Sequence, residues 1–120
     1  MLSGVRYFEI ESTGMYTVRH WWGEQEIALP PKRFAKILSE LKSADEEHPD
    51  VSLTHESEWT LSYGKSGLLV FENAETGKKG EERHMKGVSP KLVLEYWRRL
   101  AKGDLAWLEL QPWQPGYGSR

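Results

Sequence analysis

The sequence contains no cysteine, so it offers no disulfide framework, no thiol nucleophile and no cysteine metal site. This absence fits a reducing compartment. No apolar run approaches the ~20 residues that a membrane span needs. The first residues, Met1 to Val5, lack the basic start and the apolar stretch of a secretory signal. Together these features predict a cytoplasmic protein with no membrane partner.

An excess of charge of one sign is also missing. The 16 Lys and Arg residues nearly balance the 18 Asp and Glu residues, and the formal net charge is −2. Affinity for nucleic acid or for anionic membranes depends mainly on a cationic field. We therefore expect no nucleic-acid partner.

The common catalytic and cofactor motifs are absent as well. The chain has no HExxH or HxH metal motif, no G-x-S-x-G nucleophile elbow and no glycine-rich phosphate cradle. His55, next to Glu56 and Glu58, is the nearest approach to a ligand cluster, but a polar loop between strands explains it better. We expect no cofactor, no metal and no catalytic residue. The histidines are His20, His48, His55 and His84.

A β-hairpin is predicted between Glu58 and Glu72, and we place it at the centre of the fold. Trp59, Leu61 and Tyr63 alternate with polar residues, as in a half-buried strand. Residues 64–67 (GKSG) have turn chemistry. The apolar run 68–71 predicts a second strand that is covered on both faces.

Two helices are predicted by apolar stripes and start signals. The first begins at Pro30-Pro31, fades over residues 43–47 and has its stripe at Phe34, Ile37, Leu38 and Leu41. The second begins at Ser89-Pro90, ends at Gly103 and has its stripe at Leu92, Val93, Tyr96, Trp97 and Leu100.

The remaining pattern predicts further strands and a tail. Strands are expected at residues 5–11, 15–22, 51–55 and 105–110, with a turn at 12–14. Residues 27–29 are a short strand or a lead-in, and residues 81–88 are a strand or an irregular loop. The expected class is α+β, with a mostly antiparallel sheet of five to seven strands and two helices packed on one face. Residues 1–110 form a single domain, and residues 111–120 form a Pro/Gly-rich, loosely held tail.

Exposed aromatic and acidic residues are the candidates for binding. Six tryptophans are many for 120 residues, so one or two should be at least partly exposed. In the predicted strand 15–22, Tyr16, Val18, His20 and Trp22 would share one face, and Trp21 would point the other way. Acidic loops could face a basic cleft of a partner. The predicted contact set is Trp21, Trp22, Glu24, Glu26, Glu56 and Glu58.

The layout resembles the small immunity proteins of bacterial polymorphic toxin systems, in particular the group found with deaminase-type toxins. The resemblance begins near Leu29. It rests on the Pro-led helix to Leu41, the hairpin 59–71, the helix SPKLVLEYWRRLAKG and a final strand with Trp107, beyond which lies Trp113. It implies a non-enzymatic protein that neutralises a cognate toxin in a tight one-to-one complex in the cytoplasm. The family offers no catalytic motif to transfer.

Two other hypotheses stay open. A small enzyme or ligand-binding domain would have a pocket between sheet and helices. Its lining would include Trp59, Tyr63, His84 and Trp97. A subunit of a larger assembly would dock through residues 111–120.

Overall fold

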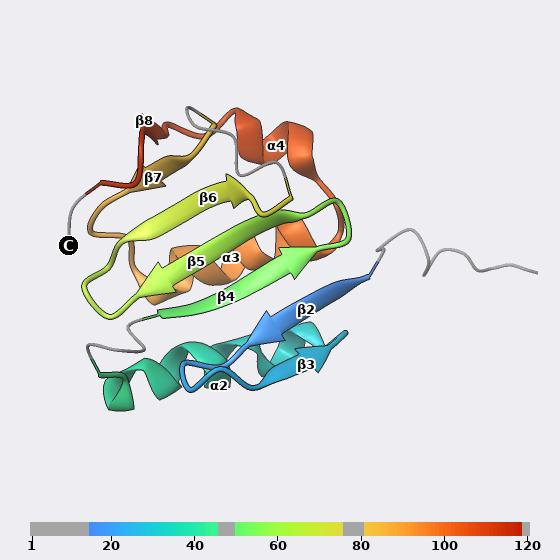
Figure 1. The fold of residues 1–120 in the computed structure, drawn as a ribbon, viewed down its shortest axis with the longest axis vertical. Helices are drawn as coiled ribbons and strands as arrows, with labels where there is room; N and C mark the ends of the chain where they lie inside the picture. The colour runs from blue at the N-terminus through green and yellow to red at the C-terminus, as the bar shows by residue number, and fades with distance from the viewer. Residues whose placement is uncertain (1–14, 46–49, 76–80, 119–120) are drawn as a thin grey trace, which may run out of the picture.

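The computed structural model describes residues 15–45, 50–75 and 81–118, which form a sheet with helices packed on one face (Figure 1). The strands are β2 (Tyr16–Arg19), β3 (Gln25–Ile27), β4 (Asp50–His55), β5 (Trp59–Gly64), β6 (Leu69–Asn73), β7 (Arg83–Met85) and β8 (Gln114–Pro115). The helical elements are η1 (Pro31–Arg33), α2 (Phe34–Ser39), η2 (Glu40–Ser43), α3 (Pro90–Ala101) and α4 (Leu105–Glu109).

The seven strands are all antiparallel and lie in the order β3-β2-β4-β5-β6-β7-β8. The expected α+β class, with a mostly antiparallel sheet and two helices on one face, is confirmed. The strand expected at 5–11 and the turn expected at 12–14 lie outside the described residues.

The central hairpin is β5 and β6, paired through Tyr63 with Leu69 and through Leu61 with Phe71. Its turn depends on Gly67, whose φ of +92° a residue with a Cβ rarely adopts. Leu69 and Phe71 are fully buried, whereas Val70 is only half-buried. The run 68–71 is therefore not covered on both faces, because helices pack against one side of the sheet only.

The two long apolar stripes pack against each other and against the sheet. Phe34 of α2 contacts Trp97 of α3 edge-on, with ring centroids 5.5 Å apart, and Tyr16 of β2 at 5.9 Å. The Ser89 hydroxyl caps α3 by accepting a hydrogen bond from the Leu92 amide at 3.2 Å. Leu92 itself is exposed, unlike the rest of its predicted stripe.

The strand expected at 105–110 is wrong, because this segment is the short helix α4. The alternation in LAWLEL fits a strand, but a segment of six residues is too short to distinguish the period of a strand from that of a helix. The Asp104 carboxylate accepts a hydrogen bond from the Trp107 amide at the helix start, and Leu108 is buried in the core one helical turn on. These local caps and contacts favour the helix.

The chain after Leu110 is packed rather than loosely held, as far as Gly118. Trp113 stacks on Phe71 with ring centroids 5.2 Å apart, and its indole N–H donates to the Leu108 carbonyl at 2.7 Å. Strand β8 pairs with β7, and the Tyr117 hydroxyl donates to Glu72 at 2.6 Å. The segment therefore completes one end of the sheet.

Replacing Trp113 with alanine is expected to lower the free energy of unfolding by about 2 kcal/mol, because a half-buried indole and its hydrogen bond are lost. Urea denaturation measures the change. The matched control is Leu110→Ala, since that side chain is 81% exposed and its removal should have little effect. Equal stability of the two variants would show that the packed tail contributes nothing.

Candidate partner-binding face

The sheet face opposite the helices is covered by short polar side chains. Cross-strand register places Thr17 beside Thr54, and Thr54 beside Thr60. The hydroxyls of Thr54 and Thr60 lie 2.9 Å apart and form a hydrogen bond. Ser52 pairs with Ser62 in the same row. Helices α2 and α3 lie behind the sheet in Figure 1, so this polar face is turned toward the viewer.

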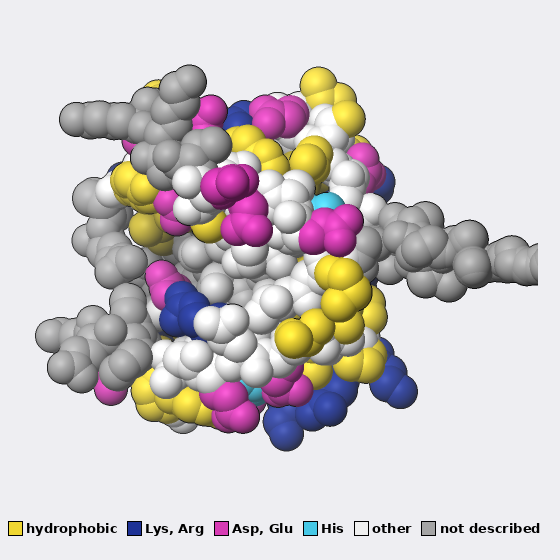
Figure 2. Space-filling model, turned by 45° about the vertical axis from the view of Figure 1, so that its right-hand side comes forward, with side chains coloured by type: hydrophobic (Ala, Val, Ile, Leu, Met, Phe, Trp, Pro, Cys, Tyr) yellow, Lys and Arg dark blue, Asp and Glu magenta, His cyan; other side chains and the backbone are white. Residues whose placement is uncertain are grey.

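A hollow of about 460 Å³ lies on this face over β3, β2 and β4. Its floor includes Ser52 and Thr54, whose short side chains leave the space. Two hydrophobic side chains border it, Met15 at 52% exposure and Ile27 at 71%. Figure 2 shows the face as a pale polar expanse bordered by hydrophobic, acidic and basic side chains. The hollow thus combines a polar floor with exposed apolar side chains.

Glu56 and Glu58 provide the acidic border of the hollow. The Glu56 carboxylate accepts a hydrogen bond from the Met15 amide at 3.1 Å, so it is held beside the exposed methionine. Glu58 has a φ of +74°, which is unfavourable for a residue with a Cβ. Its backbone is held there by a bond from its own amide to the His55 carbonyl and one from Ala74 to its carbonyl.

The β2–β3 turn carries the two adjacent tryptophans. The expected strand 15–22 ends at Arg19, because the His20 amide donates to the Glu24 carbonyl and closes a turn. Trp22 lies beyond the end of this strand, and its side chain is 45% exposed and stacks on His20 with ring centroids 4.3 Å apart. Trp21 is half-buried and meets Trp22 edge-on. The Trp22 indole donates to Glu24 at 3.1 Å.

His20 is clamped between two carboxylates under Trp22. Its Nε2 lies 2.6 Å from Glu26 and its Nδ1 lies 2.7 Å from Glu40 of η2. A neutral imidazole has one N–H only, so two donated bonds require the protonated ring. Burial acts to lower the pKa of His20, but the two carboxylates outweigh it, and the pKa is raised above its usual value. The clamp joins the β2–β3 hairpin to the helical layer.

The predicted contact set is therefore divided between two ends of β2. Trp21, Trp22, Glu24 and Glu26 lie at or beside the β2–β3 turn, whereas Glu56 and Glu58 lie at the β4–β5 turn. The two groups are on the order of 15 Å apart along β2, from the rise per strand residue. One carboxylate oxygen of Glu26 is already hydrogen-bonded to His20.

Two residues of the hollow, Met15 and Ile27, were missed by the sequence reasoning. Polar alternation in strands β4 and β5 was the available signal that one face of the sheet is open to solvent. Which exposed apolar residues border that face follows from the register of β2 and β3. Local sequence patterns do not predict that register.

The residues proposed for an alternative pocket do not come together. Trp97 is fully buried in the core, and Trp59 stacks on Phe71 at 4.6 Å. His84 faces the polar side of the sheet, where its Nδ1 lies 2.9 Å from the Gly116 carbonyl. The Tyr63 hydroxyl donates to the Val88 carbonyl at 2.5 Å. The prediction that these four side chains line one pocket is therefore wrong.

His55 is a buried neutral side chain. Its Nδ1 accepts a hydrogen bond from the Ser57 amide at 3.1 Å, which requires that nitrogen to be unprotonated. Burial lowers the pKa of His55, although Glu56 acts in the opposite direction. Within residues 15–45, 50–75 and 81–118, no cluster of three or more His, Asp or Glu side chains could hold a metal ion.

Charge is unevenly distributed over the two sides of the sheet. Exposed cationic side chains are concentrated on the helical layer and include Lys32, Arg33, Lys36, Lys42, Lys91, Arg98 and Lys102. Glu56 and Glu58 border the hollow on the open face, which Arg19, paired with Asp50 at 3.2 Å, also lines.

The chain matches no protein-family model, no curated protein and no solved structure. Among the described residues, none of the helices is both long enough and apolar enough to cross a membrane.

Proposed function

We propose that this chain is a non-enzymatic binding protein, and specifically an immunity protein that neutralises a cognate bacterial toxin in the cytoplasm. The partner would be a protein whose active-site groove is basic. The observation that carries the proposal is the helix-free sheet face, with its hollow, its exposed Met15 and Ile27, and its acidic border at Glu56 and Glu58.

The chemistry of this face suits a protein partner better than a small ligand. Exposed apolar side chains give anchors that lose water on docking, and nearby carboxylates attract a basic surface. Trp22 and Glu24 at the β2–β3 turn would make a second contact at the far end of β2. A partner that covered both ends would bury the whole open face, and its active site would be occluded.

The proposal is tested by capture followed by inhibition. The tagged protein should retain one stoichiometric partner from its own cells. That partner, expressed alone, should arrest growth, and coexpression of this chain should restore growth. A partner whose activity is the same in the complex and alone would refute neutralisation, even if binding is tight.

Neutralising the acidic border is expected to slow association with the partner. Glu56→Gln combined with Glu58→Gly should reduce the association rate ~3–10-fold at low salt, because steering by opposite charge is weakened. Glycine is chosen at position 58 because it adopts the observed φ of +74° without strain. The rates are measured by surface plasmon resonance at several salt concentrations.

The matched control for that experiment is Glu95→Gln, which removes a carboxylate from the helical layer, where Glu95 pairs with Arg99 at 2.9 Å. It should leave the association rate unchanged. The effect of the border variant should also shrink at high salt, where charges are screened. A loss in each variant in proportion to the charge removed, two carboxylates against one, would mean that net charge, and not this face, governs the encounter.

A further inference from the structure

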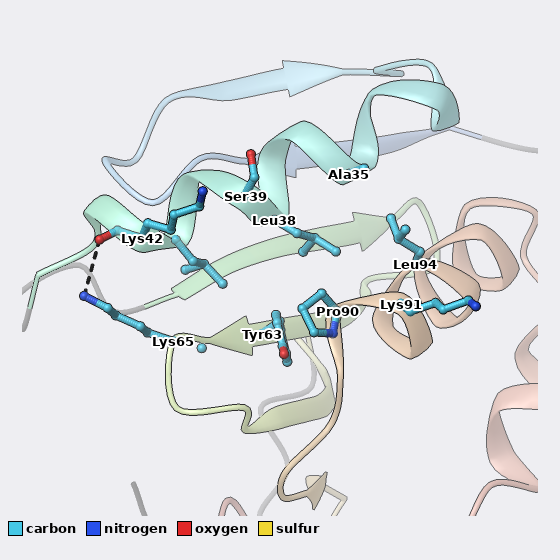
Figure 3. Close-up of a pocket in the computed structure, with 11 residues that line it drawn as sticks. Ala35, Leu38, Ser39, Lys42, Tyr63, Lys65, Pro90, Lys91 and Leu94 are labelled. Carbon is cyan, nitrogen blue, oxygen red and sulfur yellow. Dashed lines mark hydrogen bonds between the residues drawn. The ribbon is translucent and has the colours of Figure 1, made fainter.

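A second hollow, on the helical side of the sheet, lies between α2, η2, the end of β5 and the start of α3 (Figure 3). Its volume is about 520 Å³, within the range of ~300–1,000 Å³ for small-molecule sites. Leu38, Leu41 and Tyr63 form its buried floor, and each is at most 6% exposed. Ala35 and Leu94 form apolar walls. We call this hollow the helical groove.

The hydroxyl groups in the helical groove already donate their protons elsewhere. The Tyr63 hydroxyl donates to the Val88 carbonyl at 2.5 Å, and the Ser39 hydroxyl donates to the Lys36 carbonyl at 2.7 Å. An extended peptide would bring backbone N–H and C=O groups into an apolar space that offers them few partners, at a cost in free energy. A hydrocarbon chain makes no such demand.

Three lysines border the helical groove, namely Lys42, Lys65 and Lys91. Figure 3 shows Lys42 and Lys65 at one end and Lys91 at the α3 end. The Lys65 ammonium lies 3.4 Å from the Lys42 backbone carbonyl, which places the Lys65 side chain at the η2 end of the groove. No carboxylate is present among the described lining residues. The border therefore favours a ligand with negative charge.

We propose that the helical groove binds a single-chain amphiphile with an anionic head group, such as a medium-chain fatty acid. The chain lies over Leu38, Leu41 and Tyr63, and the head group lies at the end of the groove that Lys42 and Lys65 border. Lysine stems also add apolar surface along such a chain while the ammonium stays in water. This site is on the side of the sheet opposite the proposed partner-binding face, so it does not depend on the proposed function.

The test is fluorescence titration of the full chain with a dansyl-labelled undecanoic acid, followed by displacement with dodecanoate below its critical micelle concentration. Saturable binding at one site per chain is expected. Dodecanoate should displace the probe, and dodecyltrimethylammonium, with a chain of the same length and a cationic head, should not. Displacement by the cationic amphiphile equal to that by dodecanoate would overturn the proposal.

Variants then locate the site. Lys42→Gln combined with Lys65→Gln should weaken probe binding about fivefold, because both exposed charges next to the head group are removed. Ala35→Trp should reduce it further by filling the groove mouth from an exposed position. The matched control is Lys36→Gln, an exposed lysine of α2 that does not line the groove.

Two results would contradict the assignment. One is that the double lysine variant, whose exposed positions leave the core intact, binds the probe as tightly as the control. The other is that an acidic amphipathic peptide displaces the probe and dodecanoate does not, which would assign the groove to a protein partner.

Discussion

Replacing Trp97 with alanine should lower the free energy of unfolding by about 3–5 kcal/mol, the largest effect expected for a single side chain in this protein. Trp97 lies on α3, is fully buried and meets Phe34 of α2 edge-on at 5.5 Å. Its removal leaves a cavity where both helices meet the sheet. The free energy of unfolding of a native domain is only about 5–15 kcal/mol. The variant should therefore retain little stability.

The companion variant Trp97→Phe separates packing from polarity. The Trp97 indole N–H is buried and has no hydrogen-bond partner among the described residues. Phenylalanine keeps most of the aromatic volume and removes a buried donor that has lost its water. Urea denaturation should therefore show a much smaller loss for Trp97→Phe than for Trp97→Ala. Losses that agree within about 0.5 kcal/mol would show that the cavity is not the cause.

His20→Ala should cost about 2–3 kcal/mol at pH 6, because two charge-assisted hydrogen bonds in a nearly buried site are lost. The His20 side chain is 8% exposed and lies between Glu26 and Glu40. Its removal leaves two carboxylates near each other with no cation between them. The hairpin β2–β3 would also lose its link to η2.

The cost of His20→Ala should become smaller as the pH rises. The pKa of His20 is raised in the folded state, whereas an unfolded histidine has a pKa of ~6.5. Below pH ~6.5 both states hold the proton, so the stabilisation is complete. Above this pH the unfolded state releases its proton first, so the stabilisation declines until the folded-state pKa is passed.

The measurement is the free energy of unfolding of both proteins between pH 6 and pH 9. The relevant quantity is the difference in free energy of unfolding between wild type and variant. The lowered pKa of His55 gives both proteins a pH dependence of the opposite sign, and this cancels in the difference. Glu26→Gln combined with Glu40→Gln keeps the histidine and should remove the same pH dependence. A difference that is constant or grows with pH would refute the clamp.

Elements with strong local signals were predicted correctly from the sequence. The hairpin β5–β6 was indicated by alternation around a glycine turn, and α3 by Ser89-Pro90 at its start and Gly103 after its end. These signals depend on residues within a few positions of each other. Predictions for short segments were less reliable. Residues 105–110 were predicted as a strand, but the Asp104 cap and the burial of Leu108 favour a helix.

The candidate site was predicted only in part, for a related reason. The acidic residues Glu56 and Glu58 do border the hollow on the open face, but Trp21 and Trp22 lie at the far end of β2. Strand register decides which residues share a hollow, and register is set by pairing between distant segments. Met15 and Ile27 line the same hollow as Glu56 and Glu58 only through that pairing.

The sequence alone was enough to define the α+β class, the central hairpin and the two main helices, because periodicity and end signals act over short stretches of chain. The tertiary structure decided which face of the sheet is open, where Trp113 packs and how His20 is held. It also showed that exposed lysine and arginine side chains are concentrated on the helical layer. Each of these features depends on contacts between residues far apart in the chain, which no local pattern records.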